Sequence, residues 1–168
     1  MKAIYIILFV IIQTTASAQS VAELDKKGGF KEFKVGDSLA THKEKIKYSK
    51  TLENADTRLF LVKERVSVKT YTGEIELKFY KDKVQEVIVS FKNTSKSNFE
   101  DLVKSLETLY GDSQSQKKKS PGLARFEKVF VWNGEKIALR IGYDENYRLT
   151  EMVFLDQKDT LDKLKEEF

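Results

Sequence analysis

The chain has 168 residues, a formal net charge of +4 and no cysteine. This length suits one domain, and the absence of cysteine excludes disulfides, thiol nucleophiles and thiolate metal sites. Basic and acidic residues alternate closely, as in Lys43-Glu44-Lys45, which indicates a solvated surface and not a basic stripe for nucleic acid. We therefore expect no nucleic-acid partner.

Residues 1–18 have the three-part layout of a signal peptide. Met1-Lys2 is basic, Ala3 to Ile12 is an apolar run, and a polar stretch ends in Ala16-Ser17-Ala18. The apolar run is shorter than the roughly 20 residues that a helix needs to cross a bilayer. We expect cleavage after Ala18 and a periplasmic or secreted protein without a transmembrane segment; a retained membrane anchor is the alternative.

The first half of the remaining chain predicts a short helix followed by strands. Asp37-Ser38 offers a helix N-cap, and Leu39 and Ile46 follow at helical spacing. Alternating apolar residues indicate a half-buried strand from 74 to 79. Further strand-like segments lie at 59–62, 66–71 and 84–91.

The second half opens with the clearest helix, predicted at 97–110. Ser97 to Glu100 has the pattern of a capping box, and Gly111 suits the helix end. Strands are predicted at 126–132, 137–143 and 147–155, with Asn133-Gly134 as a type I′ hairpin turn. A last helix is predicted at 159–168.

The two halves match at an offset of 61 positions. The matched pairs are Val68 and Val129, Tyr71 and Trp132, Gly73 and Gly134, and Glu74 and Glu135. The predicted fold class is α+β: an antiparallel sheet covered by helices, built from a tandem helix-plus-three-or-four-strand repeat. The repeats span about 30–92 and 96–156 within a single domain, 19–168.

This layout resembles the tandem-repeat periplasmic modules of the β-lactamase-inhibitor-protein type and the outer-membrane-assembly lipoproteins of the SmpA/OmlA type. The chain lacks the cysteines of the former and the lipidation site of the latter. The resemblance implies an architecture and a habit of binding other proteins, and it implies no functional residues.

Few residues suggest catalysis or metal binding. His42 is the only histidine, so it has no second imidazole as a co-ligand. Asp144-Glu145-Asn146 lacks the spacing of a calcium loop and predicts a plain turn. Glu74 and Glu135 occupy equivalent repeat positions and are the candidates for a carboxylate pair. We predict no catalytic residue, no metal and no cofactor; the lysines 117–119 could touch an anionic surface but are better explained by solvation.

The leading hypothesis is an exported, non-catalytic binding module that engages another envelope or secreted protein, or, as a less favoured case, a small ligand. Tyr71, Trp132 and Tyr143 near the hairpins are the candidate partner-binding residues. A buried Trp132 with a bonded indole would instead be structural. The alternatives are a carboxylate-based hydrolase of the cell envelope and a structural envelope protein.

Overall fold

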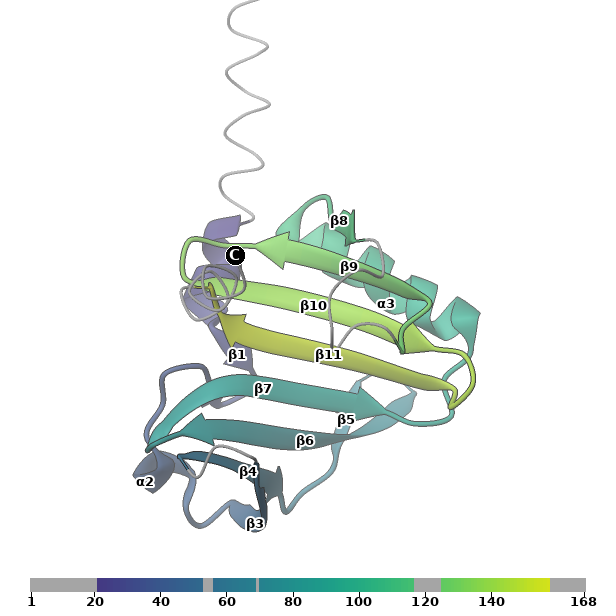
Figure 1. The fold of residues 1–168 in the computed structure, drawn as a ribbon. Coiled ribbons are helices and arrows are strands. Elements are labelled where there is room, and N and C mark those ends of the chain that lie inside the picture. The colour runs from purple at the N-terminus through teal and green to yellow at the C-terminus, as the bar shows by residue number, and fades with distance from the viewer. Residues whose placement is uncertain (1–20, 53–55, 69, 117–124, 158–168) are drawn as a thin grey trace, which may run out of the picture.

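The computed structural model describes residues 21–52, 56–68, 70–116 and 125–157. The predicted signal peptide, lysines 117–119 and the predicted helix 159–168 lie outside these ranges. Most of the described chain forms a nine-stranded antiparallel sheet in the order β3-β4-β6-β7-β11-β10-β9-β8, with β5 paired to β6 (Figure 1). Its strands are β3 (Ile46–Thr51), β4 (Thr57–Val62), β5 (Val66–Val68), β6 (Tyr71–Tyr80), β7 (Lys83–Phe91), β8 (Gln114–Gln116), β9 (Lys128–Asn133), β10 (Ile137–Asp144) and β11 (Leu149–Asp156).

The predicted helix-covered α+β fold with two helix-plus-strand repeats is wrong. The structure is mostly one large antiparallel sheet, and the helix expected in the first repeat is a single turn, α2 (Leu39–His42). The matched glycines also differ in setting. Gly73 lies inside β6, where a side chain would meet the ring of Phe91, whereas Gly134 lies in the turn after β9. The similarity between the two halves at an offset of 61 positions therefore reflects only a shared pattern of strand residues.

Apolar residues at alternate positions form one buried face of the sheet. Ile75, Leu77 and Phe79 of β6 are fully buried, as the alternation predicts. Most of the predicted strands are present with small shifts at their ends. The ladder between β7 and β11 joins the two halves of the chain into one continuous sheet.

The long helix α3 (Lys96–Tyr110) is present, but its capping box lies two residues before the predicted one. The hydroxyl of Ser95 accepts from the backbone N–H of Asn98, and the Asn98 side chain accepts from the backbone N–H of Ser95. Asn93, just after β7, has a φ of 58°, in the left-handed region that asparagine tolerates. This residue turns the chain out of the strand, and the helix begins three residues later. None of the described helices is long and apolar enough to cross a bilayer.

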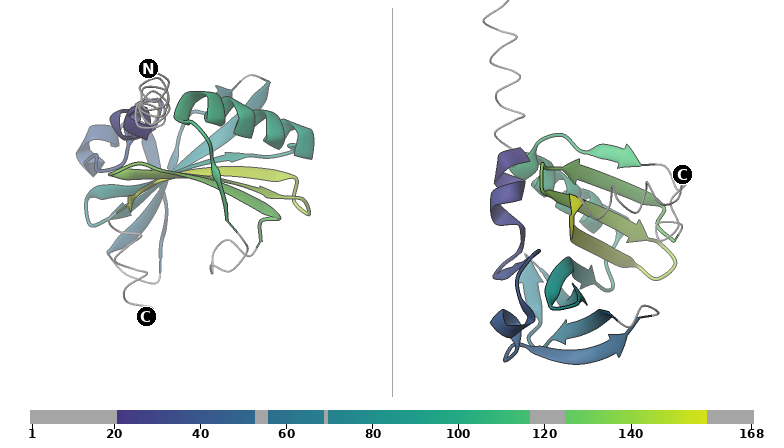
Figure 2. Two further views of the ribbon diagram at one scale, coloured as in Figure 1. Left: turned by 90° about the horizontal axis from the view of Figure 1, so that it is seen from above. Right: turned by 60° about the vertical axis from the view of Figure 1, so that its left-hand side comes forward.

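The N-terminal segment, residues 21–34, packs on the same face of the sheet as α3 (Figure 2). It contains helical residues 21–27 and a two-stranded hairpin of β1 (Gly29–Phe30) and β2 (Phe33–Lys34). Leu24 is fully buried and anchors the helical residues in the core. Gly28 has a φ of 63° and Gly29 lies so close to Phe33 that a side chain would collide with its carbonyl.

The β9–β10 hairpin is present, but its predicted type I′ turn at Asn133-Gly134 is wrong. Asn133 pairs with Ala138, and the N–H of Gly134 donates to the carbonyl of Ile137 over 2.9 Å. Gly134 does not have a positive φ. A side chain there would instead lie 2.3 Å from a carboxylate oxygen of Asp25, so the close approach of Asp25 explains this glycine.

Candidate functional site

A cavity of about 620 Å³ lies between the sheet, α3 and the N-terminal segment. Its floor is the buried face of the sheet, formed by Phe91, Ile141, Met152 and Phe154. Its volume falls within the range of about 300–1,000 Å³ that small-molecule sites occupy. The cavity is thus large enough for a ligand and has an apolar floor.

Helix α3 forms one wall of this cavity. Leu102, Leu106 and Leu109 line it at helical spacing. Leu102 is buried, Leu106 is half-buried, and Leu109 is 49% exposed. The apolar face of α3 therefore serves partly as core and partly as the surface of a cavity.

The N-terminal segment forms the opposite wall and brings basic residues to the cavity. Phe30 contributes an apolar ring, and four lysines, which we call the rim lysines, line the site: Lys26, Lys27, Lys31 and Lys34. Glu23 is the one acidic residue among the lining residues, and it pairs with Lys26 over 3.4 Å. The rim is therefore positively charged beside an apolar interior.

Asp25 fixes this wall to the sheet. Its carboxylate accepts backbone N–H groups from Glu135, Lys136 and Ile137 at 2.7, 2.9 and 2.9 Å. Hydrogen bonds to a charged acceptor are stronger than neutral ones, and three successive N–H groups form a concave anion site. The β9–β10 turn thus holds the helical residues 21–27, and with them the position of the basic wall.

Tyr110, at the end of α3, is a polar residue among those that line the cavity. Its side chain is 5% exposed, and no hydrogen bond joins its hydroxyl to another of the described residues. Burial, and to a lesser degree the nearby negative charge of Glu23, raises the pKa of Tyr110 above its ordinary value. The hydroxyl is therefore protonated at neutral pH and available as a donor. The ammonium of Lys27 lies 5.4 Å from the centre of its ring.

The three aromatic residues singled out from the sequence do not form an exposed cluster. Trp132 is 3% exposed, and its indole N–H donates to the carbonyl of Gly111 over 2.7 Å. Tyr143 is 4% exposed and stacks on Phe99 with ring centres 5.5 Å apart. Half-buried Tyr71 accepts a hydrogen bond from Asn98. All three contact α3 or the residue that ends it, which favours a structural role in holding this cavity wall.

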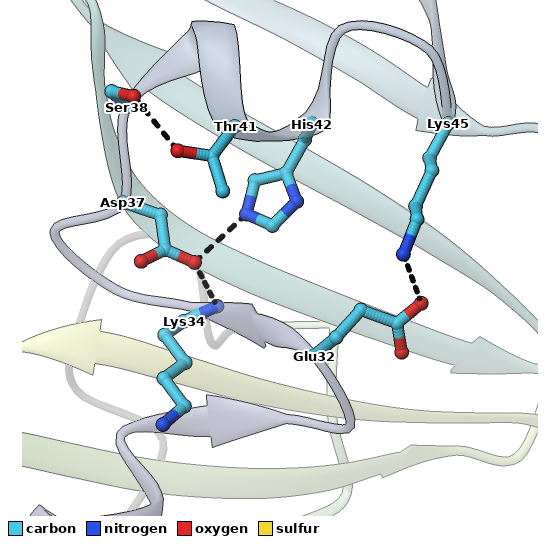
Figure 3. A network of polar contacts seen from close by, with 7 residues as sticks. All are labelled: Glu32, Lys34, Asp37, Ser38, Thr41, His42 and Lys45. Carbon is cyan, nitrogen blue, oxygen red and sulfur yellow. Dashed lines mark hydrogen bonds and ion pairs between the residues drawn. The ribbon is translucent and has the colours of Figure 1, made fainter.

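His42 lies in a polar network beside α2 (Figure 3). It is 2% exposed, its Nε2 lies 2.8 Å from an Asp37 carboxylate oxygen, and its ring packs on Phe33 at 5.0 Å. Ser38 directs its hydroxyl to Thr41 and not to the imidazole. The histidine and aspartate therefore lack the aligned nucleophile of a hydrolase triad, and the network closes the corner between β2 and β3.

The carboxylates considered for catalysis lie far apart in the sheet. Across the sheet, Glu74 is aligned through its partners in β7 and β11 with Gly142, which lies near the end of β10. Glu135, in contrast, precedes the start of β10. The hydrogen bond from Lys92, above all, lowers the pKa of Glu74, so it is a poor proton donor. Asp144 accepts the N–H of Tyr147 within the predicted turn, and the described residues hold no cluster of three or more metal-ligating side chains.

No protein family, curated protein or solved structure matches the chain in the three comparisons made. The resemblance to tandem-repeat periplasmic modules therefore stays a prediction. The function has to be argued from the site itself.

The residues of the cavity were largely missed in the sequence. The rim lysines are spread over nine positions and form no long run of like charge, whereas lysines 117–119 are a continuous run and are therefore more conspicuous in the sequence. One indication of the site is nevertheless visible in the sequence: Lys26-Lys27 precede Phe30, and Lys31 follows it. Basic side chains around an isolated aromatic residue indicate a surface with both charged and apolar contacts.

Proposed function

We propose that the protein is a non-catalytic binding module and that it binds a small apolar molecule in the cavity between α3 and the N-terminal segment. The observation that carries this proposal is the cavity of about 620 Å³ over an apolar floor. The expectation of a protein partner rests in part on Tyr71, Trp132 and Tyr143, and two of these residues are almost fully buried. The small ligand is therefore the better supported form of the binding hypothesis.

The size of the cavity argues against a packing defect. Protein interiors are close-packed and contain few voids larger than a water molecule. On a scale of about 24 cal/mol per Å³, a sealed and empty void of this volume would cost roughly 15 kcal/mol. That cost equals or exceeds the total stability of a typical domain, about 5–15 kcal/mol. A cavity of this size is consistent with a solvent-accessible site kept open for a ligand.

The test uses the neutral fluorescent probe N-phenyl-1-naphthylamine, whose emission rises in apolar surroundings. We expect saturable binding, with straight-chain alcohols displacing the probe. Each added methylene should improve their affinity by about 0.8 kcal/mol, or roughly fourfold, until the cavity is full. The variant Leu106→Trp should abolish binding, because the indole would occupy the space between α3 and the floor.

The matched control is Leu61→Trp. Leu61 is also half-buried, but it lies on β4 and does not line the cavity. This variant should bind the probe like the unaltered protein. Absence of saturable binding, or equal loss in both variants when both remain folded by circular dichroism, would contradict the proposal.

We also propose that the protein is exported, on the basis of residues 1–18. Mass spectrometry of protein recovered from the producing cells should show a chain beginning at Gln19. A chain that retains Met1 would contradict export processing and would leave the cavity argument unaffected.

A further inference from the structure

The distribution of charge around the cavity is one-sided. Of the described residues, its lining contains the four rim lysines and a single acidic residue, Glu23. Because Glu23 pairs with Lys26, the other three lysines determine the charge that a bound molecule meets. A cleft lined by one sign of charge concentrates ligands of the opposite sign.

Among the described residues, no ion pair or hydrogen bond holds the ammonium group of Lys27, Lys31 or Lys34. Lys34 extends away from the Asp37–His42 network (Figure 3). Elsewhere in the structure several lysines are paired, for example Lys45 with Glu32 and Lys78 with Glu86. Other exposed lysines, such as Lys43, Lys47 and Lys50, also have no carboxylate partner among the described residues, so the feature that distinguishes Lys27, Lys31 and Lys34 is that they line the cavity.

Lys31 also has an unusual backbone conformation. Its φ of 54° lies in the left-handed region, which is unfavourable for a non-glycine residue. Glycine or asparagine would suit this turn of the β1–β2 hairpin better. Lys81 and Arg148 have the same conformation away from the cavity, so the contribution of Lys31 rests on its place in the cavity lining.

Resting on the function proposed above, we propose that the ligand is a single-chain fatty acid, with its alkyl chain on the apolar floor and its carboxylate among the rim lysines. Tyr110 lines the same cavity, and its hydroxyl, which has no hydrogen-bond partner among the described residues, is a further donor. An apolar cavity with a few polar groups that fix orientation is the usual design of a small-molecule site. The excess of positive charge attracts a carboxylate, and a single alkyl chain suits the limited volume.

The experiment compares three ligands with the same twelve-carbon chain and different heads. Dodecanoate, dodecanol and dodecyltrimethylammonium are titrated against the bound neutral probe. We expect dodecanoate to bind about tenfold more tightly than dodecanol at low ionic strength, because several exposed ion pairs each contribute a modest amount. Added salt should reduce this preference. The cationic amphiphile should bind most weakly.

The variant Lys27→Gln/Lys31→Asn/Lys34→Gln removes the free rim charges. Its affinity for dodecanoate should fall about tenfold further than its affinity for dodecanol, so that the preference between the two ligands is lost. The matched control, Lys43→Gln/Lys47→Gln/Lys50→Gln, removes the same charge from exposed residues that do not line the cavity. The control should keep most of the preference for dodecanoate.

The outcomes separate this inference from the function on which it rests. Equal binding of dodecanoate and dodecanol, or an equal loss in the two triple variants, overturns the fatty-acid assignment and leaves an apolar site. Failure of all three amphiphiles to displace the probe contradicts the proposed function itself. If the protein sediments with phosphatidylglycerol vesicles equally well with and without Leu106→Trp, the lysines contact a membrane surface, and the fatty-acid inference is wrong.

Discussion

The buried face of the sheet has two regions that look alike in sequence and differ in what covers them. Under β4, β6 and β7, Phe79 is fully buried and meets Phe60 edge to face with ring centres 5.3 Å apart. Under β10 and β11, Ile141 and Phe154 are also buried, but they form the floor of the cavity. We call these the packed region and the hollow region.

The difference arises from the covering elements. The packed region is closed at the corner where His42 and Phe33 contact each other. The hollow region is covered by two separate elements, α3 and the rest of the N-terminal segment, and each is held by contacts of its own. Asp25 holds one, and Trp132 and Tyr143 hold the other. Two walls that are fixed independently can leave a space between them.

The largest effect should come from the packed region. Phe79→Ala removes a fully buried ring and should lower the free energy of unfolding by about 3–5 kcal/mol. Urea denaturation measures this change. A loss below about 1 kcal/mol would show that this region can rearrange or is itself open, and the comparison would fail.

The next largest effect on stability should come from the contact between Asp25 and the β9–β10 turn, which positions the basic wall. Asp25→Ala leaves three backbone N–H groups without their acceptor and should cost about 1–3 kcal/mol. Gly134→Ala should have a similar effect, because its side chain would collide with the same carboxylate and, at 2.8 Å, with the backbone carbonyl oxygen of Ile137. The double variant should then cost less than the sum of the two changes, because Asp25→Ala removes the first of these collisions. Full additivity in urea denaturation would mean that the two residues do not act through one contact.

The alternation of apolar residues made most of the sheet predictable. Ile75, Leu77 and Phe79 specify both a strand and its buried face. The strand β3 was missed because only Ile46 is buried and the rest of this edge strand is exposed, so no alternation is visible. Similarly, Ser95 and Ser97 both precede the apolar face of α3, and only the path of the chain out of β7 decides which one caps it.

The cavity could not be predicted by the same means. Leu106 and Leu109 have the spacing of an ordinary core-facing helix, and periodicity does not report whether the opposite element touches them. The Asp25 contact joins residues 110 positions apart, so no local pattern indicates it. The similarity of the two halves led to the wrong prediction of a helix-plus-strand repeat. Hairpins with one apolar face have the same sequence pattern whatever element covers them.

The anchor of α3 should have a smaller effect on stability than the Asp25 link. Trp132→Phe keeps most of the buried ring and removes the donor to the Gly111 carbonyl, which should cost about 1 kcal/mol. If the cavity depends on this anchor, probe affinity should fall together with stability. Unchanged binding despite the loss in stability would show that the position of α3 is set elsewhere, with Tyr143 and Phe99 the first residues to test.

The smallest effect on folding should come from the hollow region itself. Leu109 is 49% exposed, so Leu109→Ser should change the free energy of unfolding by less than about 0.5 kcal/mol, the usual range for surface substitutions. The same change places a hydroxyl on the apolar wall and should weaken binding of the neutral probe and of dodecanoate by a common factor, because it alters the chain site and not the charged rim. Loss of stability without loss of binding would mean that Leu109 belongs to the core and does not form part of the cavity wall. Loss of binding without loss of stability is the behaviour that distinguishes a ligand site from a packed interior.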